Sequence, residues 1–262
     1  MTAPPAPALF RPDPGAASLP RMIAAQASLE TRTLLRNGEQ LLLVLVIPVL
    51  LLIGFGEGSF ISIGTRSRVN FLVPGIIALA IMSTAFTSQA IATGFERRYG
   101  VLKRLGATPL SRVGLIAAKT CTVIAVEAGQ AAIIVGAGYA LGWHPHGTAA
   151  GIAWAVLLAA AGTAALSGLA LLMAGTLRAE ATLAAANLVY VVLLGVGGVL
   201  FSLTKFPHAA QGPLKLLPSG ALSDGLRTVL GGSTGLPVRD LFVLVVWAVV
   251  GIGLAARYFR WE

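Results

Sequence analysis

The chain has 262 residues, of which 56% are hydrophobic and 11% charged, and its mean hydropathy is +0.84. Soluble domains carry about 25% charged residues, so this composition excludes both a soluble globular domain and a disordered chain. The formal net charge is +9, yet no basic patch interleaved with aromatic residues occurs, which argues against a nucleic-acid partner. The single cysteine, Cys121, excludes an internal disulfide and a cysteine-rich metal site.

The region before the first apolar run is expected to stay out of the bilayer. Residues 1–17, rich in proline and alanine, are predicted to be a disordered leader, and no cleaved signal peptide is evident. Residues 18–38 predict a helix that starts at Ser18 and ends at Asn37-Gly38. Its moderate apolar face fits either an interfacial helix on the inner membrane surface or a solvated cytoplasmic helix. The basic residues of this helix are Arg21, Arg32 and Arg36.

Residues 41–256 predict an all-α membrane domain with six transmembrane helices. A hydrocarbon core of about 30 Å requires roughly 20 apolar residues per helix. The 50 uncharged residues 128–177 are too long for one span, and the turn at 142–147 divides them. The first predicted span is 41–55, with a kink at Pro48 and an extension through 58–63. The other five are 69–94, 113–141, a fourth that ends at Leu177, 181–204 and 241–256.

The distribution of positive charge predicts the orientation of these spans. Six spans place both termini on one side, and with that side inside, 13 of the 19 Lys and Arg residues lie in inner segments. Inner loops of membrane proteins carry this excess, so both termini are expected in the cytoplasm, with 257–262 as a short tail. The outer segment 205–239 contains four prolines and is predicted to form short re-entrant helices packed against protein before the last span.

The connector between the second and third predicted spans, residues 96–112, reads ERRYGVLKRLGATPLSR. Residues 96–105 are expected to form one short cytoplasmic helix that Gly106 and Pro109 end. Leu102 and Leu105 lie at i, i+3 among basic residues, a pattern typical of an apolar knob that enters a groove of another protein. Positive charge that only orients the spans is the alternative interpretation. The ordered combination of Gly100, the two leucines and Thr-Pro-Leu favours contact with another protein over a role in orientation alone.

This connector resembles that of ABC-2 type transporter permeases, the membrane subunits of certain ATP-binding-cassette exporters. The family pattern is approximately Glu-Arg-Glu-x-Gly-Thr-Leu-acid-x-Leu, followed by Ser/Thr-Pro-Leu and a later Lys. The chain departs from it at Arg98, Val101 and Lys103, where an acid, Thr and an acid are usual. This basic variant is similar to the drug-resistance-exporter branch and suggests a more acidic partner surface. The matching residues are Glu96, Arg97, Gly100, Leu102, Leu105, Thr108, Pro109, Leu110 and Lys119.

The resemblance implies a permease in the plasma membrane, paired with a second permease (identical or paralogous) and with two separate ATPase subunits. Such exporters move drug-like or lipid-linked substrates of hydrophobic or amphiphilic character. ATP and Mg²⁺ would bind to the ATPase, since the pair Lys119-Thr120 lacks the glycines of a phosphate loop. Neither a cofactor nor enzymatic activity is therefore expected in this chain. Residues implied in coupling to the ATPase are Glu96, Arg97, Arg98, Gly100, Leu102, Lys103, Arg104, Leu105, Thr108 and Pro109.

Three polar side chains within the predicted spans are further candidates. Inserting Glu127 costs about 2.5–3.5 kcal/mol, which makes it a functional candidate by default. It fits either a protonated carboxyl bonded to Gln130 or to another span, or the proton site of a secondary transporter, the alternative function. Gln89 and Asn187 are predicted to form interhelical hydrogen bonds rather than to bind substrate. No metal site is predicted, because the two histidines of the 142–147 turn have no third ligand near them.

Glycines in the last two predicted spans indicate close helix packing. Gly251 and Gly253 are expected to let two helices approach closely. The glycines at 195, 197 and 198 fit both a substrate path and simple packing, and the sequence favours neither.

Overall fold

The computed structural model describes residues 15–57, 68–145, 148–231 and 235–259. Within these ranges every regular element is a helix, which confirms the predicted all-α membrane fold. Most of the predicted leader, the proposed extension of the first span and the last three residues of the tail lie outside the described residues.

Thirteen helical segments follow one another in the described part of the chain. They are α1 (Leu19–Arg36), α2 (Gly38–Glu57), α3 (Arg68–Ile81), the π-helix η2 (Met82–Ser88), α4 (Gln89–Arg98), α5 (Val101–Gly106), α6 (Arg112–Ala140), α7 (Ala149–Thr176), α8 (Ala179–Val196), the 3₁₀ helix η3 (Leu203–Lys205), α9 (His208–Leu214), α10 (Pro218–Leu230) and α11 (Val238–Tyr258).

Five described helices are long and apolar enough to cross a membrane. They correspond to the second to sixth predicted spans, and the second is one continuous helix of α3, η2 and α4. The first predicted span is α2, whose 20 residues measure about 30 Å. Its described apolar part, Val44–Gly56, is shorter than the other five.

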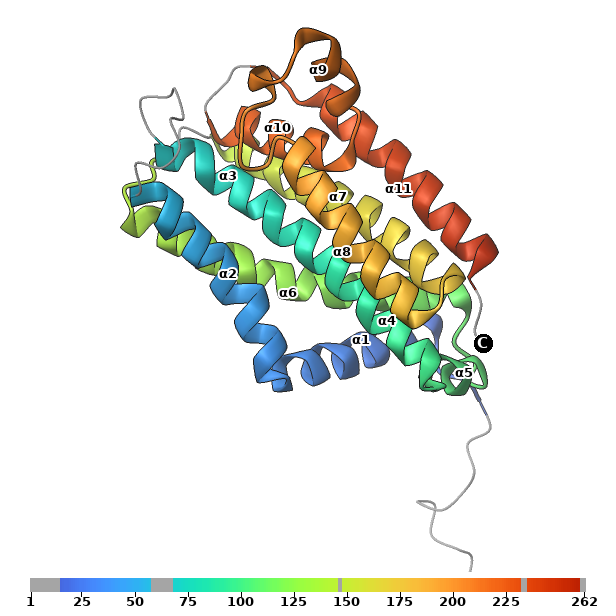
Figure 1. Cartoon of the computed structure of the whole chain (residues 1–262). Helices are drawn as coiled ribbons and strands as arrows, with labels where there is room; N and C mark the ends of the chain where they lie inside the picture. Colours follow the sequence, from blue (N-terminus) through green and yellow to red (C-terminus); the bar gives the residue numbers. More distant parts are fainter. Residues whose placement is uncertain (1–14, 58–67, 146–147, 232–234, 260–262) are drawn as a thin grey trace, which may run out of the picture.

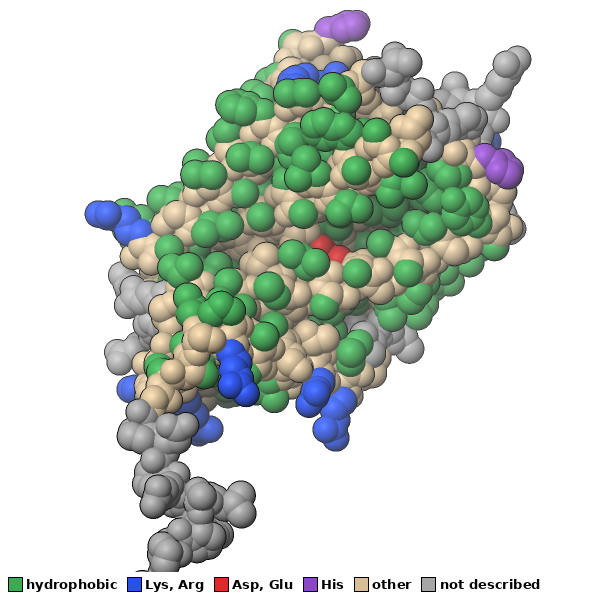
Figure 2. Space-filling view, turned by 180° about the vertical axis from the view of Figure 1, so that it is seen from behind, with side chains coloured by type: hydrophobic (Ala, Val, Ile, Leu, Met, Phe, Trp, Pro, Cys, Tyr) green, Lys and Arg blue, Asp and Glu red, His purple; other side chains and the backbone are tan. Residues whose placement is uncertain are grey.

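The spanning helices run side by side, and α1 lies across one end of the bundle at a steep angle to them (Figure 1). Helix α5 lies at this same end, which we call the connector end, whereas α9 and α10 lie at the opposite end. Seen from behind, hydrophobic side chains cover the middle of the molecule, and Lys and Arg gather mainly toward the connector end (Figure 2). A hydrophobic middle between charged ends suits a bilayer.

Helix α7 is the centre of the packing and contacts α4, α6, α10 and α11. Its buried residues include Leu158 and Leu166, which lie in the main apolar cluster with Leu222 of α10. Within the predicted outer segment, the short helix α10 is mostly buried against α3, α7 and α11, whereas α9 has no buried residue. Small residues along α7 let these neighbours approach its backbone.

The closest of these approaches joins α7 to α11. A Cβ atom on Gly168 would lie 2.7 Å from the backbone nitrogen of Ile252 and 2.9 Å from the carbonyl carbon of Gly251. At Gly168 only hydrogen fits without moving a backbone, and a Cβ on Gly251 would lie 3.1 Å from the backbone nitrogen of Leu169. Gly253, the other glycine predicted to pack closely, has nothing within 4 Å of such a Cβ.

We therefore expect Gly168→Val to destabilise the protein by about 3 kcal/mol, the upper end of typical overpacking costs. The reason is that valine meets backbone, which cannot rotate away as a side chain can. Thermal unfolding of the purified protein in detergent measures the effect. Gly253→Val is the matched control and should leave the melting temperature nearly unchanged. Equal melting temperatures for both variants would contradict the close α7–α11 contact.

The fifth predicted span, residues 181–204, is wrong at its end, because α8 stops at Val196. Gly198 takes a φ of 65°, a left-handed conformation that a helix cannot continue through. The Arg227 guanidinium of α10 then donates to the carbonyls of Gly198 and Val199, and it lies 3.9 Å from the centre of the Phe71 ring. Burial lowers the pKa of Arg227 to about 10, which leaves it charged at neutral pH. Gly197 and Gly198 thus end a helix.

Candidate functional site: the connector and its support

The predicted single helix over residues 96–105 is wrong, since the connector divides into two parts. Glu96, Arg97 and Arg98 belong to the last turn of α4. The chain then turns at Gly100, whose φ of 71° favours glycine, and α5 begins at Val101. The sequence pattern allowed a continuous helix because a single glycine costs only about 1 kcal/mol inside one.

The prediction that Leu102 and Leu105 together form a knob for another protein is contradicted at Leu102. Leu102 is fully buried, and Leu105 is partly buried against the same cluster. This connector cluster is apolar and draws from α1, α5, α6, α7 and α11. Its buried members are Leu102, Leu110, Leu115, Ile116, Leu171, Ala255 and Phe259. The two leucines therefore anchor α5 to its own chain, an outcome that i, i+3 spacing alone does not distinguish from a knob.

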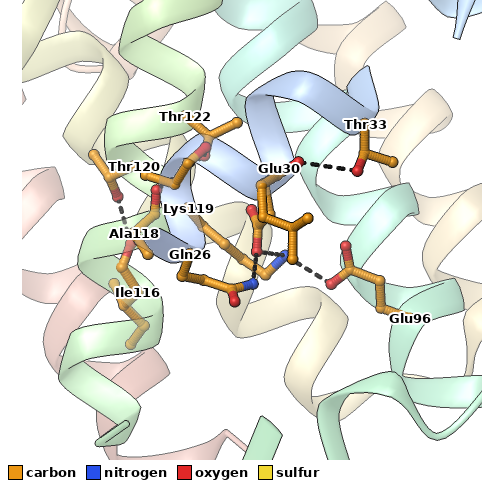
Figure 3. Close-up of polar contacts among 11 residues, drawn as sticks. Gln26, Glu30, Thr33, Glu96, Ile116, Ala118, Lys119, Thr120 and Thr122 are labelled. Atoms are coloured by element: carbon orange, nitrogen blue, oxygen red, sulfur yellow. Dashed lines mark hydrogen bonds and ion pairs between the residues drawn. The ribbon is translucent and has the colours of Figure 1, made fainter. Parts of the chain in front are cut away.

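A buried ion triad lies beside this cluster (Figure 3). The Lys119 Nζ of α6 is 2.6 Å from Glu96 Oε2 of α4 and 3.2 Å from Glu30 Oε1 of α1. Gln26 donates to Glu30 one turn away on α1. The Lys119 side chain is only 4% exposed, so its charge is compensated by these two carboxylates and not by water. The triad joins α1, α4 and α6 at the connector end.

Glu30 is a site residue that sequence reasoning missed. It is a rare acid on an otherwise basic helix, with Gln26 four residues before it, and that contrast was the available signal. A second contact supports the same pairing of helices. The Thr122 hydroxyl of α6 lies 3.2 Å from the Ala27 carbonyl of α1 and shares its proton between this carbonyl and that of Ala118, at 3.1 Å on α6 itself. Helix α1 is thereby held against α6.

The two basic residues in the last turn of α4, Arg97 and Arg98, contact the junction of α7 and α8. Arg97 donates to the Leu177 carbonyl, and Arg98 pairs with Glu180 in the first turn of α8. Arg98 and Glu180 are both more than half exposed, so this pair adds little stability. Its significance is positional: the end of α4 is fixed to the loop between the fourth and fifth spans.

The remaining part of the connector is exposed. Its polar and basic side chains, together with the aromatic ring at its start, form one surface on α5 and the turn after it. We call this the α5 surface, and its exposed residues are Tyr99, Val101, Lys103, Arg104, Thr108 and Pro109. The Thr108 hydroxyl donates to the Leu105 carbonyl and helps to end α5. Tyr99, which is 69% exposed, is a further residue that the sequence pattern did not single out.

The predicted basic residues of α1 point away from the bundle. Arg21, Arg32 and Arg36 are all exposed, whereas Met22 and Ile23 pack against the connector cluster. Helix α1 thus has an inner face that packs against the connector cluster and an outer face that carries cations. Contact of that outer face with lipid headgroups stays a prediction.

Two intramembrane candidates have different surroundings. Gln89 of α4 is buried and accepts a hydrogen bond from the Ser167 hydroxyl of α7 at 2.6 Å, the interhelical role that the sequence predicts. Asn187 of α8 is exposed on the surface of the chain. This position does not favour the predicted hydrogen bond to another helix of the same chain. Its neighbours Leu188 and Val191 are also more than half exposed.

Glu127 lies in the middle of α6 and is buried. The Thr163 hydroxyl of α7 contacts Glu127 Oε2 and also the Ala159 carbonyl. One hydroxyl proton serves one acceptor fully, so both contacts are satisfied together when a protonated Glu127 donates to Thr163. Gln130, the other proposed partner, is instead bonded to Thr84 and to the Val44 carbonyl.

If the chain is the permease that the resemblance implies, this geometry predicts that Glu127→Gln leaves transport within about twofold of the unchanged protein. The amide has the same shape and can donate to Thr163 as the protonated acid does. Initial rates of transport in reconstituted vesicles, with and without an imposed proton gradient, measure the effect. Loss of transport in this variant, together with transport by the unchanged protein that depends on the proton gradient and not on ATP, would support the proton-coupled alternative.

A bundle of long apolar helices that ends in a basic, internally braced connector fits the membrane component of a transporter. The family comparison agrees: the model of the ABC-2 type transporter family matches residues 24–230, from α1 through α10. The chain belongs to the ABC-2 type transporter family and is a multi-pass membrane permease of an ABC transporter. A search of curated proteins found no match. Permeases of this family work in general with an ABC ATPase as partner.

Proposed function

We propose that this chain is the permease subunit of an ABC exporter in the plasma membrane and that the α5 surface is its contact with the ATPase. The observation that carries this proposal is the combination of an exposed basic surface on α5 with a buried inner side. Helix α5 is held by the connector cluster and follows α4 in the chain, and the ion triad joins α4 to α1 and α6. A push on the outer surface of α5 would therefore reach these three helices together.

The charge of the α5 surface favours an acidic cleft on the ATPase. Lys103 and Arg104 are exposed, and they are the charged residues of α5, whose sequence is VLKRLG. With both termini in the cytoplasm, the α5 surface faces the compartment that holds ATP. Two ATPase subunits would engage two permeases, and closure of the pair on ATP would tilt the helices joined by the triad.

Asn187 supports pairing with a second permease. An exposed amide among apolar side chains is costly in lipid, because hydrocarbon offers no hydrogen-bond partner. The surface of α8 that carries Asn187 would therefore face a second permease, identical or paralogous, or the substrate path between the two. The exposed apolar residues beside it fit a substrate that is hydrophobic or amphiphilic, drug-like or lipid-linked, as in drug efflux.

Purification of the tagged chain from its own host in mild detergent tests this function. We expect an ABC ATPase at equal stoichiometry, and mass analysis shows whether the permease pairs with itself. Reconstituted complex should accumulate a hydrophobic dye in inverted vesicles only with hydrolysable ATP. An active preparation that contains no nucleotide-binding chain would overturn the proposal.

A further inference from the structure

A cavity of about 390 Å³ lies at the connector end, between α1, α4, α5 and α6. Its size is within the range of pockets that hold drug-sized molecules. The wall includes Glu30 and Glu96 with Lys119 between them, which are the members of the triad. It also includes Val101 and Leu105, so the inner side of α5 forms part of the cavity.

Among the described residues that line this cavity, carboxylates outnumber cationic groups by one. Lys119 is the one cation among the described residues that line it, and two carboxylates share its ammonium. Lys119 is 4% exposed, whereas Glu30 and Glu96 are 17% and 28% exposed. The carboxylates therefore present more surface than the ammonium does, and a ligand in the cavity meets a net negative site.

The rest of the wall is divided between apolar and uncharged polar groups. Leu29, Leu34 and Leu105 provide apolar surface. Gln89 and Thr93 also line the cavity, and both are more than nine-tenths buried. Within the described part of the chain, the Gln89 Nε2 and Thr93 Oγ1 atoms have no hydrogen-bond partner. Buried polar atoms without partners are uncommon in proteins and indicate that something else completes the site.

We propose that this cavity binds amphiphilic cations and is the first binding site for the transported substrate. The apolar part of the ligand would lie against the leucines, and its cationic group beside Glu30 and Glu96. Since α5 forms one wall, an occupied cavity would act directly on the helix that meets the ATPase. This inference rests on the proposed function and narrows its substrate to lipophilic cations.

Tetraphenylphosphonium and tetraphenylborate form a matched pair of probes, because they share shape and size and have opposite charge. The experiment is equilibrium binding of each labelled ion, without ATP, to the permease–ATPase complex in lipid nanodiscs. We expect saturable binding of the cation and at least tenfold weaker binding of the anion.

Ala92→Phe fills the cavity from an exposed wall position on α4. It should abolish the saturable component, whereas Ala125→Phe, exposed on α6 away from the cavity, should not.

Glu30→Gln removes the excess charge while Lys119 keeps its shorter contact, to Glu96. We expect it to weaken binding of the cation at least tenfold. No saturable binding of the cation, equal binding of both ions, or binding that Ala92→Phe leaves unchanged would each overturn the inference. If any of these three outcomes occurs while the ATPase stays bound and ATP-driven transport is intact, the inference about the cavity fails and the proposed function does not. Loss of the ATPase itself would instead count against the proposed function.

Discussion

Replacing Lys119 by Met should abolish ATP-driven transport and lower the stability of the permease. The variant leaves two carboxylates facing each other at a partly buried site with no cation between them. Removing one partner of a buried ion pair costs about 3–5 kcal/mol. For a protein of this size that corresponds to a fall in melting temperature on the order of 10 °C. Thermal unfolding in detergent and transport in vesicles measure the two effects.

A triple variant separates stability from coupling. In Lys119→Met combined with Glu30→Gln and Glu96→Gln no charge is left at the site, and such replacements are often neutral for stability. We expect the melting temperature to recover to within a few degrees of the unchanged protein. Transport should stay at least tenfold reduced, because α1, α4 and α6 are no longer joined by charge. Full transport by the triple variant would show that the triad has only a stabilising role.

The second large effect is expected from reversing charge on the α5 surface. Lys103→Glu with Arg104→Glu should reduce the copurifying ATPase at least tenfold, because like charges at an interface cost several kcal/mol. Neither side chain lies in the connector cluster, so the permease itself should keep its melting temperature. Mass analysis of the tagged preparation quantifies the ATPase.

The control for this variant is Arg239→Glu, an exposed charge reversal at the start of α11, away from α5. It should leave the amount of copurifying ATPase unchanged. Substitution of Leu102 or Leu105 is not suitable here, since Leu102 is fully buried and a charge in its place would disrupt the fold. Retention of the ATPase by the double reversal would show that contact lies elsewhere on the chain.

Several features of the site were predictable from local pattern. The third and fourth spans agree closely with α6 and α7, because long, mostly apolar runs bounded by turns specify helices of one length. The glycine at residue 100, the Thr-Pro-Leu turn and the basic composition of α5 were all visible in the sequence. Together they located the connector between the second and third spans.

Other features depend on contacts between distant residues. The burial of Leu102 requires Leu171 and Phe259 from two other helices, and no spacing within the connector reveals them. The end of α8 depends on Arg227, which lies about 30 residues later and binds the carbonyls beyond the helix. Glu30 and Glu96 meet Lys119 only because α1 crosses the bundle at the connector end.

The sequence by itself determined the class of protein, the positions of most spans and the basic connector. These follow from properties of short segments: hydropathy, helix length and charge near the ends of a span. Only the tertiary structure decided which connector residues are buried, which are exposed and where the triad and its cavity lie. Those outcomes are set by packing between helices, and the energy of an ion pair or of a buried leucine depends on neighbours far away in the chain.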